Sequence, residues 1–238
     1  MGDLVFSNFS LAIIGGFMPT LLWLHFWLRE DKLHPEPRRF IVAVFAYGAI
    51  AVIPALFIEK FIGMFFTSQI ILIALWAMVE EVIKFTAVWS AYKSGAPIDE
   101  PIDWIIYMVT AALGFAALEN AFFLLQPISS EMFIQSLVVG NLRFLGATLL
   151  HVLTASLYGA ALSFAYYKRR SEKKKYLTWG LIASIVLHII FNVYIVTIGS
   201  NSNVAILILF SLIWIGLAGI IILFERIKKI RPPGKKFS

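Results

Sequence analysis

Seven long apolar stretches, each close to the length of a helix that crosses a bilayer, constrain this chain more than any other feature. A helix needs about 20 apolar residues to cross the hydrocarbon core. Polar breaks such as REDKLHPEPRR and KSGAPIDEPID separate the stretches. The stretches run roughly over 5–28, 40–58, 69–92, 104–125, 142–167, 177–198 and 204–224. The sequence therefore predicts an all-α fold, a polytopic transmembrane helix bundle of about seven spans.

The composition indicates a chain that is solvated mainly by lipid. Of its 238 residues, 60% are hydrophobic and 14% are charged, and the mean hydropathy is +0.85. A soluble domain of this length carries more charge and shorter apolar runs. There is no cysteine, which excludes disulfides and thiolate metal sites. We expect one transmembrane helical domain over 1–225, followed by a basic cytoplasmic tail over 226–238.

The placement of the basic residues predicts how the chain is oriented. Lys and Arg gather in the breaks after the first, fifth and seventh stretches, and Lys60 is the only clear case in the alternate breaks. By the positive-inside rule, the N-terminus is outside and the C-terminus is cytoplasmic. The net charge of +6 is then mainly an orientation signal and an attraction to the lipid bilayer, and we expect no nucleic-acid partner.

Few ionisable residues fall within the predicted spans, and those that do are expected to mark a function. Each charged group near mid-bilayer costs at least about 2.5–3.5 kcal/mol, so such residues usually face the bundle interior and pair with one another. Glu80, Glu119, His151 and His188 come from four different spans, and all lie about 9–17 Å below the outer surface at 1.5 Å per residue. This common depth predicts one polar layer. The full set is His25, Glu80, Glu81, Lys84, Glu119, Arg143, His151 and His188.

Lys84 accounts for one carboxylate of the adjacent pair but not for both. It follows Glu80 by four residues and Glu81 by three, so on a helix its ammonium can pair with either one. The other carboxylate needs a different role. A desolvated carboxylate can act as a general base on water, while imidazoles stabilise an oxyanion or donate a proton. This combination favours hydrolysis by an activated water molecule.

Two further hypotheses use the same residue types. His, His and Glu also bind zinc, which leaves a second Glu as the base, so metal-dependent and metal-free hydrolysis both stay open. Buried Glu, His and Lys side chains also form proton relays, so a proton- or ion-coupled membrane transporter is the alternative function. The chain shows no half-to-half symmetry of interrupted helices, a feature of many carriers.

Four sequence elements resemble motifs of the PrsW family of intramembrane proteases and, more widely, the CAAX-protease and bacteriocin-processing group. The elements occur in the order of the family and cover residues 80 to 192. EExxK alone is a weak motif, but the four together are specific. They are EEVIKF (80–85) for EExxK, PIDWIIYMVTAALGFAALEN (101–120) for an Asp followed by GFAxxEN, RFLGATLLHVLTASLYG (143–159) for the Arg–His–Thr–Gly span, and LHIIFN (187–192) for HxxxN.

The resemblance implies an intramembrane endopeptidase, with a catalytic core over 69–198, in a multi-pass protein of a prokaryotic plasma membrane. The implied substrates are membrane-anchored proteins or peptides that undergo regulated proteolysis, such as anti-sigma-like regulators. The candidate catalytic residues are Glu80, Glu81, Glu119, His151 and His188. The supporting residues are Lys84, Asn120, Arg143 and Asn192.

The cofactor is left open between none and a divalent metal such as zinc, which Glu119, His151 and His188 would hold if it is present. We expect Glu80 or Glu81 to activate the water while Lys84 holds the other carboxylate. Asn192 is expected to orient His188 or the scissile carbonyl. The sequence does not choose between the two glutamates, and it does not give the oligomeric state.

Overall fold

The computed structural model describes residues 2–30, 35–125, 133–197 and 203–232, and describes side chains in these ranges except at 2–8, 30, 133–145 and 203. The described chain forms seven α-helices and no strand, which confirms the all-α prediction. The helices are α1 (Gly2–Glu30), α2 (Arg38–Gly63), α3 (Gln69–Lys93), α4 (Asp103–Leu124), α5 (Phe133–Phe164), α6 (Arg170–Thr197) and α7 (Asn203–Ile227).

Six of the described helices are long and apolar enough to cross a membrane, and α3 is the one that is not. Every 18-residue stretch of α3 contains Glu80, Glu81 and Lys84, which together exceed the charge that a span of this kind tolerates. The apolar spans confirm the predicted membrane bundle. The helix that departs from the pattern is the one that carries the adjacent carboxylates.

The helix α4 lies at the centre of the bundle and contacts α1, α2, α3 and α5. Almost all of its side chains from Asp103 to Ala117 are buried. Two glycines allow α2 to approach it closely, because a Cβ on Gly48 would collide with the backbone of Ala111 and a Cβ on Gly114 with that of Phe45. Small residues at such crossings are typical of helices packed inside membranes.

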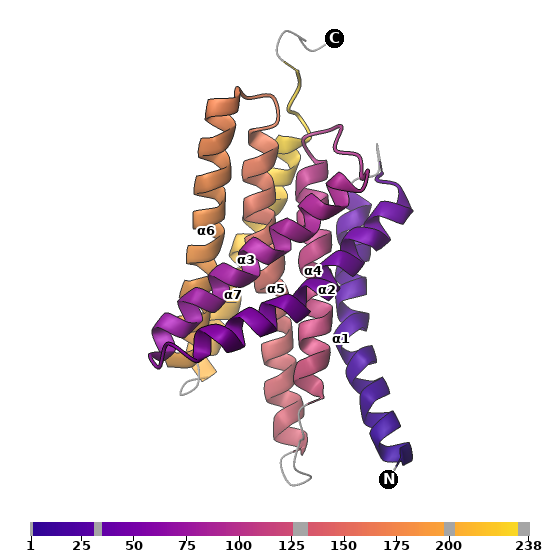
Figure 1. Ribbon diagram of the computed structural model, residues 1–238, viewed down its shortest axis with the longest axis vertical. Helices are drawn as coiled ribbons and strands as arrows, with labels where there is room; N and C mark the ends of the chain where they lie inside the picture. The colour runs from indigo at the N-terminus through magenta and orange to yellow at the C-terminus, as the bar shows by residue number, and fades with distance from the viewer. Residues whose placement is uncertain (1, 31–34, 126–132, 198–202, 233–238) are drawn as a thin grey trace.

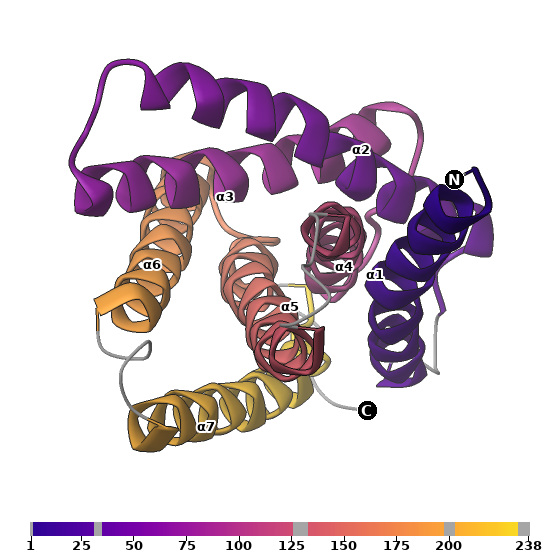
Figure 2. The same ribbon diagram turned by 90° about the horizontal axis from the view of Figure 1, so that it is seen from below.

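The helices α2 and α3 form an antiparallel pair that crosses one side of the bundle obliquely (Figure 1). Figure 2 shows this pair along one edge, α4 and α5 in the middle and α7 on the far side, with α1 and α6 at the flanks. The outer faces carry large exposed apolar side chains such as Phe57, Leu207 and Ile215. Such faces suit contact with lipid tails, which are as apolar as leucine.

The helix ends divide between two ends of the molecule. The end of α7 lies at the same end as the α5–α6 connection, and the start of α1 lies at the opposite end (Figure 1). Arg169, Arg170 and Lys173 are exposed at the α5–α6 connection. The predicted orientation therefore places this basic end in the cytoplasm.

The orientation can be tested with single cysteines, because the natural chain has none. We expect Ser171→Cys, which lies at the basic end, to react with a membrane-impermeant thiol reagent only after the cells are permeabilised. Ser68→Cys lies in the α2–α3 connection and should react on intact cells. The reverse labelling pattern would refute the predicted topology.

Candidate active site

A buried carboxylate on α3 joins three helices. Glu81 and Lys84 are both completely buried, and the Lys84 ammonium donates to Oε1 of Glu81 at 2.5 Å. The same oxygen accepts from the Thr154 hydroxyl on α5 at 3.0 Å and lies 2.7 Å from Nδ1 of His188 on α6. Oε2 accepts from the Ser184 hydroxyl, also on α6, at 2.9 Å. Glu81 thus has four hydrogen-bond partners, three at Oε1 and one at Oε2.

These contacts assign the tautomer of His188. A carboxylate only accepts hydrogen bonds, so the ring nitrogen next to Glu81 is the one that carries the proton in neutral imidazole. The other nitrogen, Nε2, then carries the lone pair. It lies 3.8 Å from Oε2 of Glu80.

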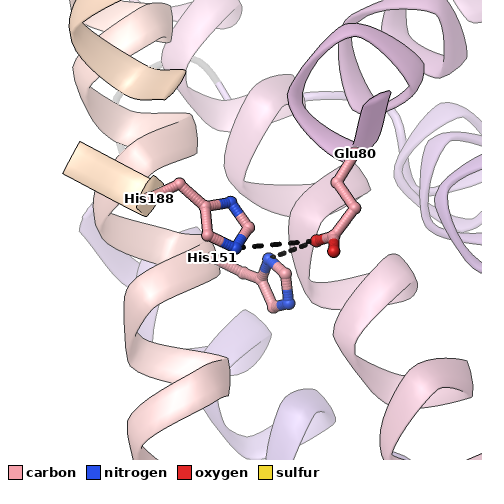
Figure 3. A group of neighbouring side chains, drawn as sticks. All are labelled: Glu80, His151 and His188. Carbon is pink, nitrogen blue, oxygen red and sulfur yellow. Dashed lines mark ion pairs between the residues drawn. The ribbon is translucent and has the colours of Figure 1, made fainter. Parts of the chain in front are cut away.

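Glu80 is adjacent to Glu81 in sequence but has a different environment. Its Oε2 atom lies 4.0 Å from Nδ1 of His151 as well as 3.8 Å from Nε2 of His188 (Figure 3). Both distances exceed a direct hydrogen bond. Oε2 is buried and has no hydrogen-bond partner among the described residues. We call this oxygen an orphaned acceptor, meaning a buried acceptor without a hydrogen-bond donor. Buried polar atoms in native structures almost always have a partner, so this exception calls for an explanation.

His151 connects α5 to α3 and α4. Its Nε2 lies 2.8 Å from Oε2 of Glu119, and its Nδ1 lies 3.0 Å from the Lys84 ammonium. Because the Lys84 ammonium can only donate, Nδ1 of His151 accepts this hydrogen bond. The ring proton of neutral His151 is then on Nε2, which donates a hydrogen bond to Glu119. The Glu119 side chain is 32% exposed, compared with 12% for Glu80, so this carboxylate lies nearer the rim of the site.

The structure brings together most of the residues expected from the sequence. Glu80, Glu81, Lys84, Glu119, His151 and His188 form one connected cluster drawn from α3, α4, α5 and α6. Ser184 belongs to this cluster although the sequence did not single it out. It lies four residues before His188 and therefore on the same helix face.

Of the four expected supporting residues, Lys84 belongs to this cluster, whereas Asn120 and Asn192 lie apart from it. Asn120 donates its amide to the Thr148 hydroxyl at 3.0 Å, which ties α4 to α5. Asn192 is half-buried one turn after His188, and no hydrogen bond joins it to the described residues of the cluster. Arg143 belongs to α5, but its side chain lies outside the described part of the chain.

One group of side chains in this cluster has the donors and spacing of a metal site. Glu80, His151 and His188 each offer one ligand atom, and these atoms lie within 4.8 Å of one another. The metal ligands expected from the sequence included Glu119 in place of Glu80. Glu119 instead lies against Nε2 of His151, while Glu80 faces Nδ1 of the same ring.

A second acidic group, Glu36, Asp99 and Asp103, also has ligand atoms within 4.8 Å of one another. It lies at the start of α4, where the carboxylates of Asp103 and Glu36 have hydrogen-bond partners. Oδ2 of Asp103 accepts from the backbone N–H groups of Asp99 and Glu100, and Oε2 of Glu36 accepts from the Tyr107 hydroxyl. Burial raises the pKa of Glu36 above its usual range. These contacts explain the group as an anchor for the loops at the start of α4.

The fold and the cluster define a class of protein: a multi-pass membrane bundle with a buried carboxylate–imidazole site. A family model described as "PrsW family intramembrane metalloprotease" matches residues 36–219. The chain belongs to this family, and it is therefore an intramembrane peptidase. This assignment does not favour the alternative of a transporter.

Curated relatives agree with the family. The chain is 27% identical to "Protease PrsW" of Geobacillus kaustophilus over 72% of this chain and 73% of the relative. It is 26% identical to "Protease PrsW" of Bacillus subtilis over 74% and 78%, and 29% identical to that of Clostridioides difficile over 77% of both chains. No solved structure gives a significant match.

The buried ion pair predicts a large effect of removing its positive partner. We expect Lys84→Met to lower the free energy of unfolding by about 3–5 kcal/mol, because it leaves the Glu81 carboxylate buried without its charge partner. Lys93→Met, at the exposed end of the same helix, should change it by less than about 0.5 kcal/mol. Denaturant unfolding of the purified protein measures both.

A double variant tests whether the two charges are coupled. Glu81→Gln together with Lys84→Met removes both charges, so its cost should be smaller than the sum of the two single costs. Additive costs would show that the pair is not coupled.

Proposed function

We propose that this peptidase hydrolyses a peptide bond of a membrane-anchored protein with a water molecule activated at Glu80, between His151 and His188. The observation that carries the proposal is the orphaned Oε2 of Glu80, buried and 3.8–4.0 Å from two ring nitrogens. This spacing is too long for direct hydrogen bonds and suits an atom that all three groups share. A carboxylate that is desolvated in this way is suited to take a proton from water.

Glu81 serves a positioning role in this proposal. Its oxygens already accept from Lys84, Thr154 and Ser184 and hold the Nδ1 proton of His188. Both oxygens of Glu81 already have donors from the protein, whereas Oε2 of Glu80 has none among the described residues. Glu81 fixes the orientation and tautomer of His188, so that Nε2 faces the place where the water reacts. This division of roles makes Glu80 the water-activating member of the adjacent pair.

The family description includes a metal ion, and the donor set fits one. Glu80, His151 and His188 offer one carboxylate oxygen and two imidazole nitrogens, the ligand types of catalytic zinc sites. Glu81 on the far nitrogen of His188 is the carboxylate partner that commonly orients a metal-bound imidazole. These three residues would hold the ion, and bound zinc would lower the pKa of its water to near 7.

If these three residues hold an ion, the roles of Lys84 and Glu119 would differ. Lys84 donates to Nδ1 of His151, so it has to leave that nitrogen for His151 to become a ligand, and it then serves Glu81 alone. With Glu80 as a ligand, Glu119 is the remaining carboxylate of the cluster that can accept a proton. Its hydrogen bond to His151 holds it beside the site.

Glu80 can be tested with an isosteric variant. We expect Glu80→Gln to lose about 10²- to 10⁴-fold of peptide hydrolysis, because the amide neither takes a proton nor carries charge. The purified protein would be reconstituted with bacterial membrane proteins in proteoliposomes, and new peptide termini would be counted by mass spectrometry. Glu225→Gln, which changes an exposed carboxylate on α7, should leave the count unchanged.

Two results would contradict this assignment. One is an unchanged set of new termini with Glu80→Gln. The other is solute flux driven by a pH gradient with no peptide product, which the carrier hypothesis predicts instead.

Elemental analysis tests the metal independently of activity. We expect close to one divalent ion per chain in the purified protein and its loss in His188→Ala, because that variant removes one of the three ligands. Asn120→Ala should keep the ion, since Asn120 bonds Thr148 outside the ligand group. An active preparation with no bound metal would rule out the ion and leave Glu80 as the base.

A further inference from the structure

A groove of about 580 Å³ lies between α1 and α7, remote from the polar cluster. Its walls are apolar and include Leu22 and Trp23 from α1 and Trp214 and Ile221 from α7. The two helices touch through aromatic rings, with Trp23 and Trp214 centroids 6.1 Å apart and Trp27 and Phe224 centroids 5.8 Å apart. The groove is therefore a shaped surface with an aromatic wall on both sides.

The groove and the active site lie on different sides of the bundle. The helix α1 packs on α4 and α7 packs on α5, whereas Glu80 and Glu81 belong to α3. In Figure 2, α4 and α5 lie between α3 and α7. A peptide held in this groove would be separated from Glu80 by two helices, so the groove is poorly placed to receive the scissile bond.

The depth of the groove corresponds to one leaflet of the bilayer. On α1 it extends from Pro19 to Trp27, close to the end of the helix at Glu30. From Pro19 to the helix end is about 16 Å at 1.5 Å per residue, and half of the hydrocarbon core is about 15 Å. Both helices end at the same end of the molecule (Figure 1). The groove residues of α1, from Pro19 to Trp27, span about 12 Å of this depth, so the groove covers most of the part of an acyl chain that lies in that leaflet.

A run of basic residues follows the groove residues at the end of α7. Trp214 and Ile221 lie seven residues apart on the groove face of α7, and Lys228 follows at the same interval just past the helix end at Ile227. Its ammonium lies over the Phe224 ring and pairs with Glu225. The segment 226–231 holds four basic residues, and Glu225 is the one carboxylate beside them. The end of α7 therefore carries a net positive charge at the depth of lipid phosphates.

Trp27 adds a polar group to the groove wall. Its indole N–H is buried and has no hydrogen-bond partner among the described residues. Tryptophan near a helix end usually lies at the membrane interface, where its N–H finds an acceptor. The Trp27 side chain is only 2% exposed, so a lipid acceptor would reach this N–H only after the ring moves.

From the groove, its depth and its charged end, we propose that α1 and α7 bind an anionic phospholipid. An acyl chain lies against Leu22 and Trp214, and the phosphate lies at the basic end of α7. The occupant is a lipid of the leaflet at the basic end of the bundle. The site is distinct from the peptidase site.

The test uses the full chain and two defined lipids. The purified protein is mixed with equimolar phosphatidylglycerol and phosphatidylcholine in detergent, and retained lipids are counted by native mass spectrometry. We expect one phosphatidylglycerol to be retained in preference to phosphatidylcholine. Lys228→Gln should reduce this preference about fivefold, because it removes one charge from the phosphate site.

A matched pair of variants tests the groove itself. Ala218 lines the groove and is exposed, so Ala218→Phe should fill it and reduce retention of both lipids at least about fivefold. Gly219 is its neighbour, and a Cβ there meets nothing within 4 Å, so Gly219→Phe adds the same bulk outside the groove and should leave retention unchanged. Equal retention by both variants, or no preference for phosphatidylglycerol, would overturn the proposal.

A crosslinker distinguishes a lipid from a polypeptide occupant. Leu22 is 67% exposed in the groove wall, so benzoylphenylalanine at this position will react with whatever lies there in native membranes. We expect an adduct with the mass of a phospholipid. An adduct with another polypeptide, including a second copy of this chain, would overturn the lipid assignment.

Discussion

The burial of the Glu81 carboxylate against the Lys84 ammonium is the interaction on which the rest of the site depends. Either charge alone would be costly at this depth, and together they still need further donors. Thr154 from α5 and Ser184 from α6 supply them, so a single carboxylate fixes three helices. The next residue, Glu80, is carried by the same helix, and its Oε2 has no donor among the described residues. In the proposed mechanism, Glu81 holds the helices together and Glu80 activates the water.

Much of the fold could be predicted because length and apolarity determine which segments cross a bilayer. The ends were less predictable: the sixth stretch was expected from residue 177, but α6 begins at Arg170. Lys, Arg and Glu are good helix formers, so charge ends the membrane-embedded part of a helix without ending the helix. In the site, depth along four spans predicted that Glu119, His151 and His188 would meet near α3. Ser184 was missed because a hydroxyl carries no charge to mark it.

The choice between Glu80 and Glu81 illustrates what one-dimensional spacing leaves undetermined. Lys84 follows Glu80 by four residues and Glu81 by three. Both spacings allow an ion pair on a helix, so the spacing does not distinguish a Glu80–Lys84 pair from a Glu81–Lys84 pair. Their different environments arise from which of them faces Ser184 and Thr154 on neighbouring helices. That depends on the rotation and tilt of α3, and α3 is held beside α2, which packs on α4 at Gly48 and Gly114. Two residues without side chains in another helix pair therefore contribute to the geometry of the site.

The three charged residues of α3 also have a consequence for how the protein is made. A nascent segment enters the membrane by its own hydrophobicity, and each charge near its centre opposes this by about 2.5–3.5 kcal/mol. The donors that Glu81 has from other helices, namely Thr154, Ser184 and His188, are synthesised some 70 to 110 residues later. During translation α3 therefore emerges before its stabilising contacts exist. Its stable insertion has to await α5 and α6. The insertion of α3 is therefore the step at which membrane assembly is most exposed to failure and to quality-control proteolysis.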